Sequence, residues 1–241
     1  RDLVMDYMDR EHFGRLPFRD LYRFLHLDAA TSRDRLALAS VFAVPDRKLL
    51  DPWDARTEVS KYDRTYITDF LLYVEAKPGQ EIPLEKILDF ILYLKKTGYP
   101  IFRVTADQYQ SKHLLQQLEV SGIRTDHVSV DRDRFPYVVM RTLIHSGKLL
   151  LPRSELLVSE LLGLEDDGQK IDHRSDTSKD GSDAIAGALY GCFGETVIAT
   201  PMARVGAAAP RSERMSGMLE TARRVQELQE MAKKLFLTGV M

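Results

Sequence analysis

The sequence has a single cysteine, Cys192, among its 241 residues. A disulfide within the chain is therefore impossible, and zinc sites or iron–sulfur clusters built from CxxC pairs are excluded. A reducing compartment is the default setting for such a chain. Cys192 lies late in an apolar segment with no base beside it, which favours a buried structural thiol over a reactive one.

A basic excess is also missing, because 34 Lys and Arg residues face 36 Asp and Glu residues, for a net charge of -2. Any nucleic-acid contact must then come from a local patch rather than from overall charge. Long hydrophobic runs are lacking too, because the longest apolar runs are far shorter than the ~20 residues that a membrane helix needs. We also find no GxxxxGK[ST] phosphate-binding loop, so we expect no ATP hydrolysis from these residues.

What the sequence does have is 44% hydrophobic residues, enough for a sizeable core. Their spacing alternates between the period of strands and the period of helices. We expect strands at 22–30, 36–44, 65–76, 100–107 and 122–130. We expect helices at about 83–98, 111–122, 133–145, 154–162 and 180–193, the second capped by Ser111 and the fourth by Ser154.

The order of these elements predicts an α/β fold. The first three strands have connections too short to hold a helix, so they should be antiparallel neighbours. The next two strands each follow a helix and should join in parallel through right-handed crossovers. The sequence therefore predicts a mixed five-stranded sheet, three antiparallel strands followed by two parallel additions, flanked by helices.

Three parts are expected along the chain: an N-terminal linker or hinge at 1–20, one α/β domain at 21–198, and a C-terminal part at 199–241. The last part combines a linker with an amphipathic helix at 212–236. That helix could dock on the domain or fray in solution, and its basic surface could instead contact a partner.

Four acidic residues stand where strands end or where a helix begins. Asp28 closes the first strand and Asp107 the fourth, while Asp180 and Asp183 open the last helix of the domain. Strand carboxyl ends and helix N-termini are where α/β folds assemble their sites. If the first and fourth strands are adjacent, Asp28 and Asp107 lie side by side, and the helix can bring Asp180 or Asp183 to them.

Carboxylates held this close are tolerated when they share a cation. Hard oxygen ligands select Mg²⁺ or Mn²⁺, and two such ions suit phosphoryl displacement. The alternative is local: a terminal Asp is common in turns, and Asp180 and Asp183 could merely cap a helix and complement its dipole. His26 is best explained as a buried strand histidine, and His173 as either a loop or a site residue.

Three stretches, FLHLDAATSRDRLALASV, VTADQYQSKHLLQQLEVSGI and KIDHRSDTSKDGSDAIAGALYG, resemble the nuclease domain of bacteriophage terminase large subunits. The resemblance covers about residues 20–193. It implies an RNase H-like fold, and it matches Asp28, Asp107, Asp180 and Asp183 to the acids of that family. It also implies Mg²⁺- or Mn²⁺-dependent endonuclease cleavage of double-stranded DNA, with two ions expected.

The resemblance further implies partners and a setting. An ATPase domain of the same polypeptide would precede residues 1–20, and the portal and the small terminase subunit would be partners. The protein would act in the cytoplasm of an infected bacterial host, with no membrane contact and no secretion.

DNA contact would fall to local basic residues. The candidates are Arg33 and Arg35 after the first acid, Arg132, Arg134 and Arg141 near the late helices, and Lys179 beside Asp180. Scattered solvated charge is the alternative for each of them. Two other functions stay open: a Holliday-junction resolvase or transposase-like nuclease with the same acids, and a non-catalytic docking module of a motor.

Overall fold

The computed structural model describes residues 21–29, 35–45, 61, 64–75, 82–107, 111–132, 134–168, 170–175 and 177–195. The expected linker at 1–20, the segment 199–241 with its helix and the candidate Arg33 lie outside these residues. No helix in the described part of the chain is long and apolar enough to cross a membrane.

The central sheet has the strand order β5-β4-β1-β2-β3-β6. Strands β1 (Arg23–Asp28), β2 (Arg35–Pro45) and β3 (Arg64–Glu75) are antiparallel neighbours, as predicted. Strands β4 (Ile101–Ala106) and β5 (Thr125–His127) extend the sheet in parallel beyond β1, also as predicted.

The prediction of five strands was wrong by one. A two-residue strand, β6 (Leu149–Leu150), pairs in parallel with β3, and it is too short to show a period in the sequence. A separate antiparallel hairpin, β7 (Leu164–Asp166) and β8 (Ile171–His173), was also missed, because its polar residues show no alternation.

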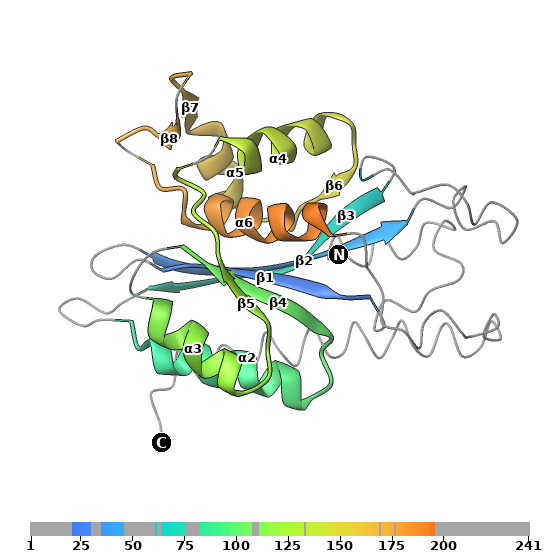
Figure 1. Ribbon diagram of the computed structural model, residues 1–241. Coiled ribbons are helices and arrows are strands. Elements are labelled where there is room, and N and C mark those ends of the chain that lie inside the picture. Colours follow the sequence, from blue (N-terminus) through green and yellow to red (C-terminus); the bar gives the residue numbers. More distant parts are fainter. Residues whose placement is uncertain are drawn as a thin grey trace, which may run out of the picture.

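Helices cover both faces of the sheet (Figure 1). Helices α2 (Leu84–Lys96) and α3 (Lys112–Val120) lie on one face. Helices α4 (Phe135–His145), α5 (Glu155–Leu162) and α6 (Asp180–Gly194) lie on the other. Strand β1 serves both cores, because Phe24 packs among the α4 and α6 residues while Leu25 and Leu27 pack among those of α2 and α3.

The sequence predicted serine caps for two helices, and the structure confirms one of them. Ser154 caps α5 as expected, since its side chain accepts a hydrogen bond from Leu157 N at 3.2 Å. The predicted Ser111 cap of α3 was wrong: the buried Ser111 hydroxyl donates to the carbonyl of Asp107 at 3.1 Å instead. That contact ties the start of α3 to the residue that follows β4.

A buried polar network stands near the start of β1. The Arg23 guanidinium donates to Asp69 Oδ2 at 2.8 Å and to the Leu21 carbonyl at 2.6 Å, and it lies 4.1 Å from the ring centroid of Phe42. The Tyr99 hydroxyl donates to the same Asp69 oxygen at 2.5 Å. Burial opposes the charge of Arg23, but Asp69 and Tyr99 together outweigh it and raise the pKa of the guanidinium.

Helix α6 approaches β1 closely where Gly187 meets the His26 ring. The buried Thr105 hydroxyl donates to the Leu25 carbonyl at 3.2 Å, so at 2.7 Å it accepts from His26 Nδ1. Burial lowers the pKa of His26 to about 3, and the ring is neutral. His26 is thus a structural strand histidine, as the sequence suggested.

Gly187→Ala should destabilise the domain. An added Cβ would lie 2.4 Å from the His26 ring, which cannot move without loss of its bond to Thr105. We expect a net loss of about 2 kcal/mol, since overpacking outweighs the better helix propensity of alanine. The melting temperature would fall by about 4–8 °C.

Gly191→Ala is the matched control, one turn further along the same helix. Its Cβ would meet only Phe24, at an ordinary 3.8 Å, so we expect no loss of stability. Equal melting temperatures for the two variants would contradict the close packing of α6 on His26.

Candidate functional site

The carboxyl ends of two parallel strands form the base of the site. Strands β1 and β4 pair in parallel with Leu27 opposite Ala106, and Asp107 N donates to the Leu27 carbonyl at 3.3 Å. Asp28 and Asp107 therefore end neighbouring strands at the same edge of the sheet. The adjacency on which the sequence argument depended is confirmed.

Helix α6 brings Asp180 and Asp183 to this edge. Burial raises the pKa of Asp28 well above its usual value, and the negative charges of Asp183, Asp180, Asp107 and Asp131 raise it further, in that order. Within the described residues, the Asp28 side chain makes no hydrogen bond or ion pair. The other three acids that the sequence singled out, and a fifth, Asp131, are thus close enough to act on the Asp28 carboxylate.

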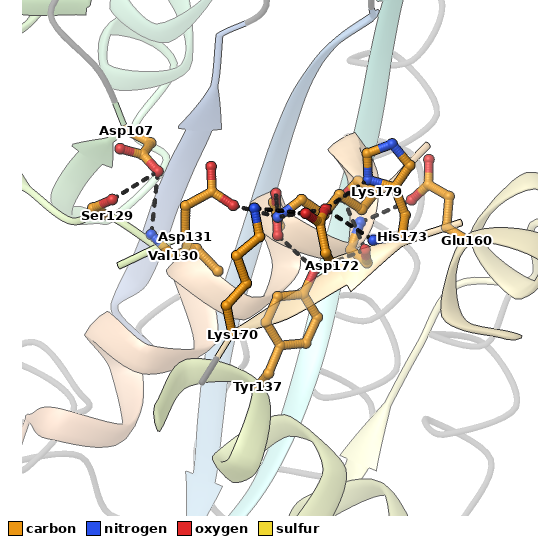
Figure 2. A network of polar contacts seen from close by, with 12 residues as sticks. Asp107, Ser129, Val130, Asp131, Tyr137, Glu160, Lys170, Asp172, His173 and Lys179 are labelled. Atoms are coloured by element: carbon orange, nitrogen blue, oxygen red, sulfur yellow. Dashed lines mark hydrogen bonds and ion pairs between the residues drawn. The ribbon is translucent and has the colours of Figure 1, made fainter. Parts of the chain in front are cut away.

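The surroundings hold two of these carboxylates in place. Asp107 Oδ2 accepts hydrogen bonds from Ser129 Oγ and Val130 N, both at 3.2 Å (Figure 2). Asp183 Oδ1 accepts from the buried Tyr137 hydroxyl at 2.5 Å. Burial raises the pKa of Asp183 to about 7, even though Lys179 and Tyr137 both act to lower it.

The alternative in which Asp180 caps α6 was wrong, whereas Asp183 does lie in the first turn of the helix, where its charge complements the dipole. Lys179 occupies the cap position of α6, but its side chain forms no capping hydrogen bond. The buried Glu160 of α5 instead accepts from Ser182 N at 2.9 Å, and the Ser182 hydroxyl donates to the Lys179 carbonyl at 2.8 Å. Glu160 therefore satisfies one of the backbone donors in the first turn of α6.

Lys179 lies among the acids, with a side chain that is only 10% exposed. Its ammonium pairs with Asp131 Oδ1, and it lies 3.4 Å from Asp183 Oδ2 and 3.9 Å from Asp172 Oδ1 (Figure 2). Burial disfavours its charge, but Asp183 and Asp131 outweigh burial and raise its pKa. The alternative that Lys179 is a solvent-exposed charge was wrong. The contact of Lys179 with DNA stays a prediction.

The other basic candidates lie in different settings. Arg35 pairs with Glu75 at 2.5 Å, and Arg132 is exposed. Arg134 holds the β7–β8 hairpin, since its guanidinium donates to Asp166 Oδ2 and to the Gly168 carbonyl, both at 2.5 Å. Arg141 is 60% exposed and lies 3.9 Å from the same Asp166 oxygen. Arg132 and Arg141 therefore present the more accessible charges.

The sequence reasoning missed four residues of the site: Asp131, Tyr137, Glu160 and Asp172. Asp172 comes from β8, where its pKa is lowered to about 2, first by the hydrogen bond from Lys170. Of the four, Asp131 had a usable signal, because it directly follows the strand that the sequence predicted at 122–130. Tyr137 and Glu160 lie in helices, where the sequence pattern is typical of an ordinary core tyrosine and an ordinary surface glutamate.

The carboxylates are not arranged as a preformed cage. In the described part of the chain, no group of three or more His, Cys, Asp or Glu side chains is placed to hold a metal ion. The donor set nevertheless fits Mg²⁺ or Mn²⁺ chemically, because it consists of hard carboxylate oxygens that repel one another. The side chains would have to turn toward a shared ion.

The stability of the metal-free domain should depend on pH through Asp183. Its pKa is raised on folding from the usual 3.8 to about 7, so the folded state binds the proton more tightly. Stability from this group is full below about pH 4 and is lost as pH rises through 7, by at most about 4 kcal/mol. Thermal melts in EDTA between pH 5 and pH 8 test this, with Asp183→Asn expected to flatten the profile.

Solved structures share this fold. The large terminase nuclease from thermophilic phage G20c aligns over 73% of this chain and 85% of its own, at 12% identity and a TM-score of 0.50. The HK97 bacteriophage large terminase aligns over 78% of this chain at 10% identity and a TM-score of 0.52. This chain covers 42% of the HK97 protein. No protein-family model and no curated protein matches the sequence.

These likenesses show the fold: the domain has the RNase H-like α/β architecture of phage large-terminase nucleases, as the sequence predicted.

Proposed function

We propose that this domain is a Mg²⁺- or Mn²⁺-dependent endonuclease that cuts double-stranded DNA during viral genome packaging. One observation carries the proposal: the carboxylates of Asp28, Asp107, Asp180 and Asp183 converge at the carboxyl ends of β1 and β4. They do so in a fold shared with two phage terminases.

The residues have separable roles in this proposal. Asp28, Asp107, Asp180 and Asp183 would hold the metal, two ions at full occupancy. Bound metal would neutralise charge on the phosphodiester and make water a better nucleophile. Ser129 and Val130 fix the Asp107 carboxylate, and Tyr137 fixes that of Asp183. These bonds would limit the orientations from which the two carboxylates turn toward an ion.

DNA would be gripped locally and weakly. The overall charge of -2 gives no general attraction, so the phosphate contacts would come from candidates such as Arg132 and Arg141. We expect binding that weakens steeply as salt rises. In the cell, an ATPase domain of the same polypeptide, the portal and the small terminase subunit would supply the rest of the grip.

Plasmid nicking tests the proposal. At low salt and with excess protein, wild type is expected to nick supercoiled DNA with Mg²⁺ or Mn²⁺, and EDTA should abolish the nicking. Asp107→Asn keeps the shape of the side chain but removes its charge, so it should cut far more slowly. Equal cutting by wild type and Asp107→Asn would reject the site. Faster cutting of branched than of linear duplexes would favour the resolvase alternative.

A further inference from the structure

Within the described part of the chain, Lys179 is the buried cation of the acidic site. The Lys179 ammonium contacts Asp131, Asp183 and Asp172, three carboxylates from three different parts of the chain. Asp131 follows β5, Asp172 belongs to β8 and Asp183 to α6. The ammonium is therefore shared by three carboxylates, rather than paired with one carboxylate close to it in the sequence.

The Lys179 side chain is held in this position from its base. Lys179 is the cap residue of α6, and its carbonyl accepts from Ser182 Oγ at 2.8 Å and from Asp183 N at 2.7 Å. Only the four-carbon stem is left to move. A lysine is a compact point charge on such a stem, so it can take and leave a cation position without a backbone change.

The ammonium uses carboxylate oxygens that a metal would also need. Asp183 Oδ1 already accepts a hydrogen bond from the Tyr137 hydroxyl. The other oxygen of Asp183, Oδ2, lies 3.4 Å from the Lys179 ammonium. The Asp131 oxygen in the ion pair is likewise occupied. A divalent ion at this place must therefore displace the ammonium before it can reach Asp183.

We propose that Lys179 holds one of the two cation positions of the site, beside Asp183 and Asp131, so that the domain without DNA binds one divalent ion. The other position would lie toward Asp28, Asp107 and Asp180, with which Lys179 forms no ion pair within the described residues, and would take the metal. The second ion enters only when Lys179 moves away, and an incoming phosphate is a suitable new partner for its ammonium. This inference rests on the proposed function, because it assigns a role to Lys179 within the same metal site.

Counting Mn²⁺ ions on the DNA-free protein tests the inference. Electron paramagnetic resonance of free Mn²⁺ gives the number bound per chain, and we expect one for wild type and two for Lys179→Met. Lys179→Arg keeps the charge and should bind one. Asp131→Asn in the Lys179→Met background should return the count to one. Lys179→Gln replaces Lys179→Met if circular dichroism shows that the latter is unfolded.

Lys170→Met is the matched control. Lys170 also pairs with Asp172, at 2.6 Å, but it is 49% exposed, and no ion pair joins it to Asp183 within the described residues. We expect one bound ion, as in wild type. Saturating Mn²⁺ should also raise the melting temperature of Lys179→Met more than that of wild type or Lys170→Met, which a purely structural lysine would not produce.

Two results would overturn the inference: a wild-type count other than one, or a Lys179→Met count no higher than that of wild type. Its failure can be told apart from failure of the proposed function. Wild type could bind Mn²⁺, and Asp107→Asn could weaken that binding, while Lys179→Met binds the same number of ions as wild type. In that case only the role of Lys179 is wrong. If wild type binds no Mn²⁺ at all, both are wrong.

Discussion

Asp28→Asn is expected to slow DNA cleavage by about 10²–10³-fold, the range for loss of one key electrostatic group in an active site. The same substitution should raise the melting temperature of the metal-free protein at neutral pH. The reason is that Asp28 is partly buried and close to four other acids, which raises its pKa and makes its charge unfavourable for folding. Removal of that charge relieves the repulsion and also removes a metal ligand.

The opposite signs make this a strong test. Nicking rates with Mn²⁺ and thermal melts in EDTA would be measured on the same preparations. Asp89→Asn, an exposed change on α2 on the opposite face of the sheet, should alter neither quantity. A loss of activity together with a lower melting temperature would mean that Asp28 acts in folding rather than in catalysis.

Asp69→Ala is expected to destabilise the domain by about 3–5 kcal/mol, because it leaves the buried Arg23 without its partner. Both side chains are only 2% exposed, and Tyr99 also loses the oxygen to which it donates. The melting temperature should fall by on the order of 10 °C. Activity at low temperature should persist, since the strand rise puts Arg23 and Asp28 about 16 Å apart.

Two variants control this prediction. Glu75→Ala breaks another ion pair between strands of the sheet, the one that Glu75 of β3 forms with Arg35 of β2, but these two side chains are 65% and 34% exposed. We expect a cost below about 1 kcal/mol. The double change Arg23→Met and Asp69→Leu should recover much of the loss, because no charge is then left buried alone. A small effect of Asp69→Ala would contradict the buried network.

The sequence predicted the sheet well because its strands carry strong, local signals. Strands β1 to β4 are long, apolar and bounded by breaks, and their connections leave few possible topologies. Strand β6 and the β7–β8 hairpin were missed for the opposite reason: they are only two or three residues long. Strand β6 is fixed by pairing with the distant β3, and the hairpin by the pairing of its two short arms with each other. Such pairing leaves no period in the sequence.

The site was predictable only in part. Asp28, Asp107, Asp180 and Asp183 could be found because each marks the end of a strand or the start of a helix. Their contacts could not be read in the same way. Tyr137 reaches Asp183 across 46 residues and Glu160 reaches Ser182 across 22, and such distant hydrogen bonds arise from packing. The structure showed that Glu160 accepts a hydrogen bond from the first turn of α6, while the role of Asp180 and Asp183 as metal ligands stays a prediction.

The most direct test of the metal site is the anomalous scattering of Mn²⁺ in crystals soaked at a concentration that supports nicking. The proposed function predicts a manganese peak coordinated by the carboxylates of Asp28 and Asp107, with Asp180 or Asp183 as a further ligand. A peak elsewhere, or none at these carboxylates, would contradict it.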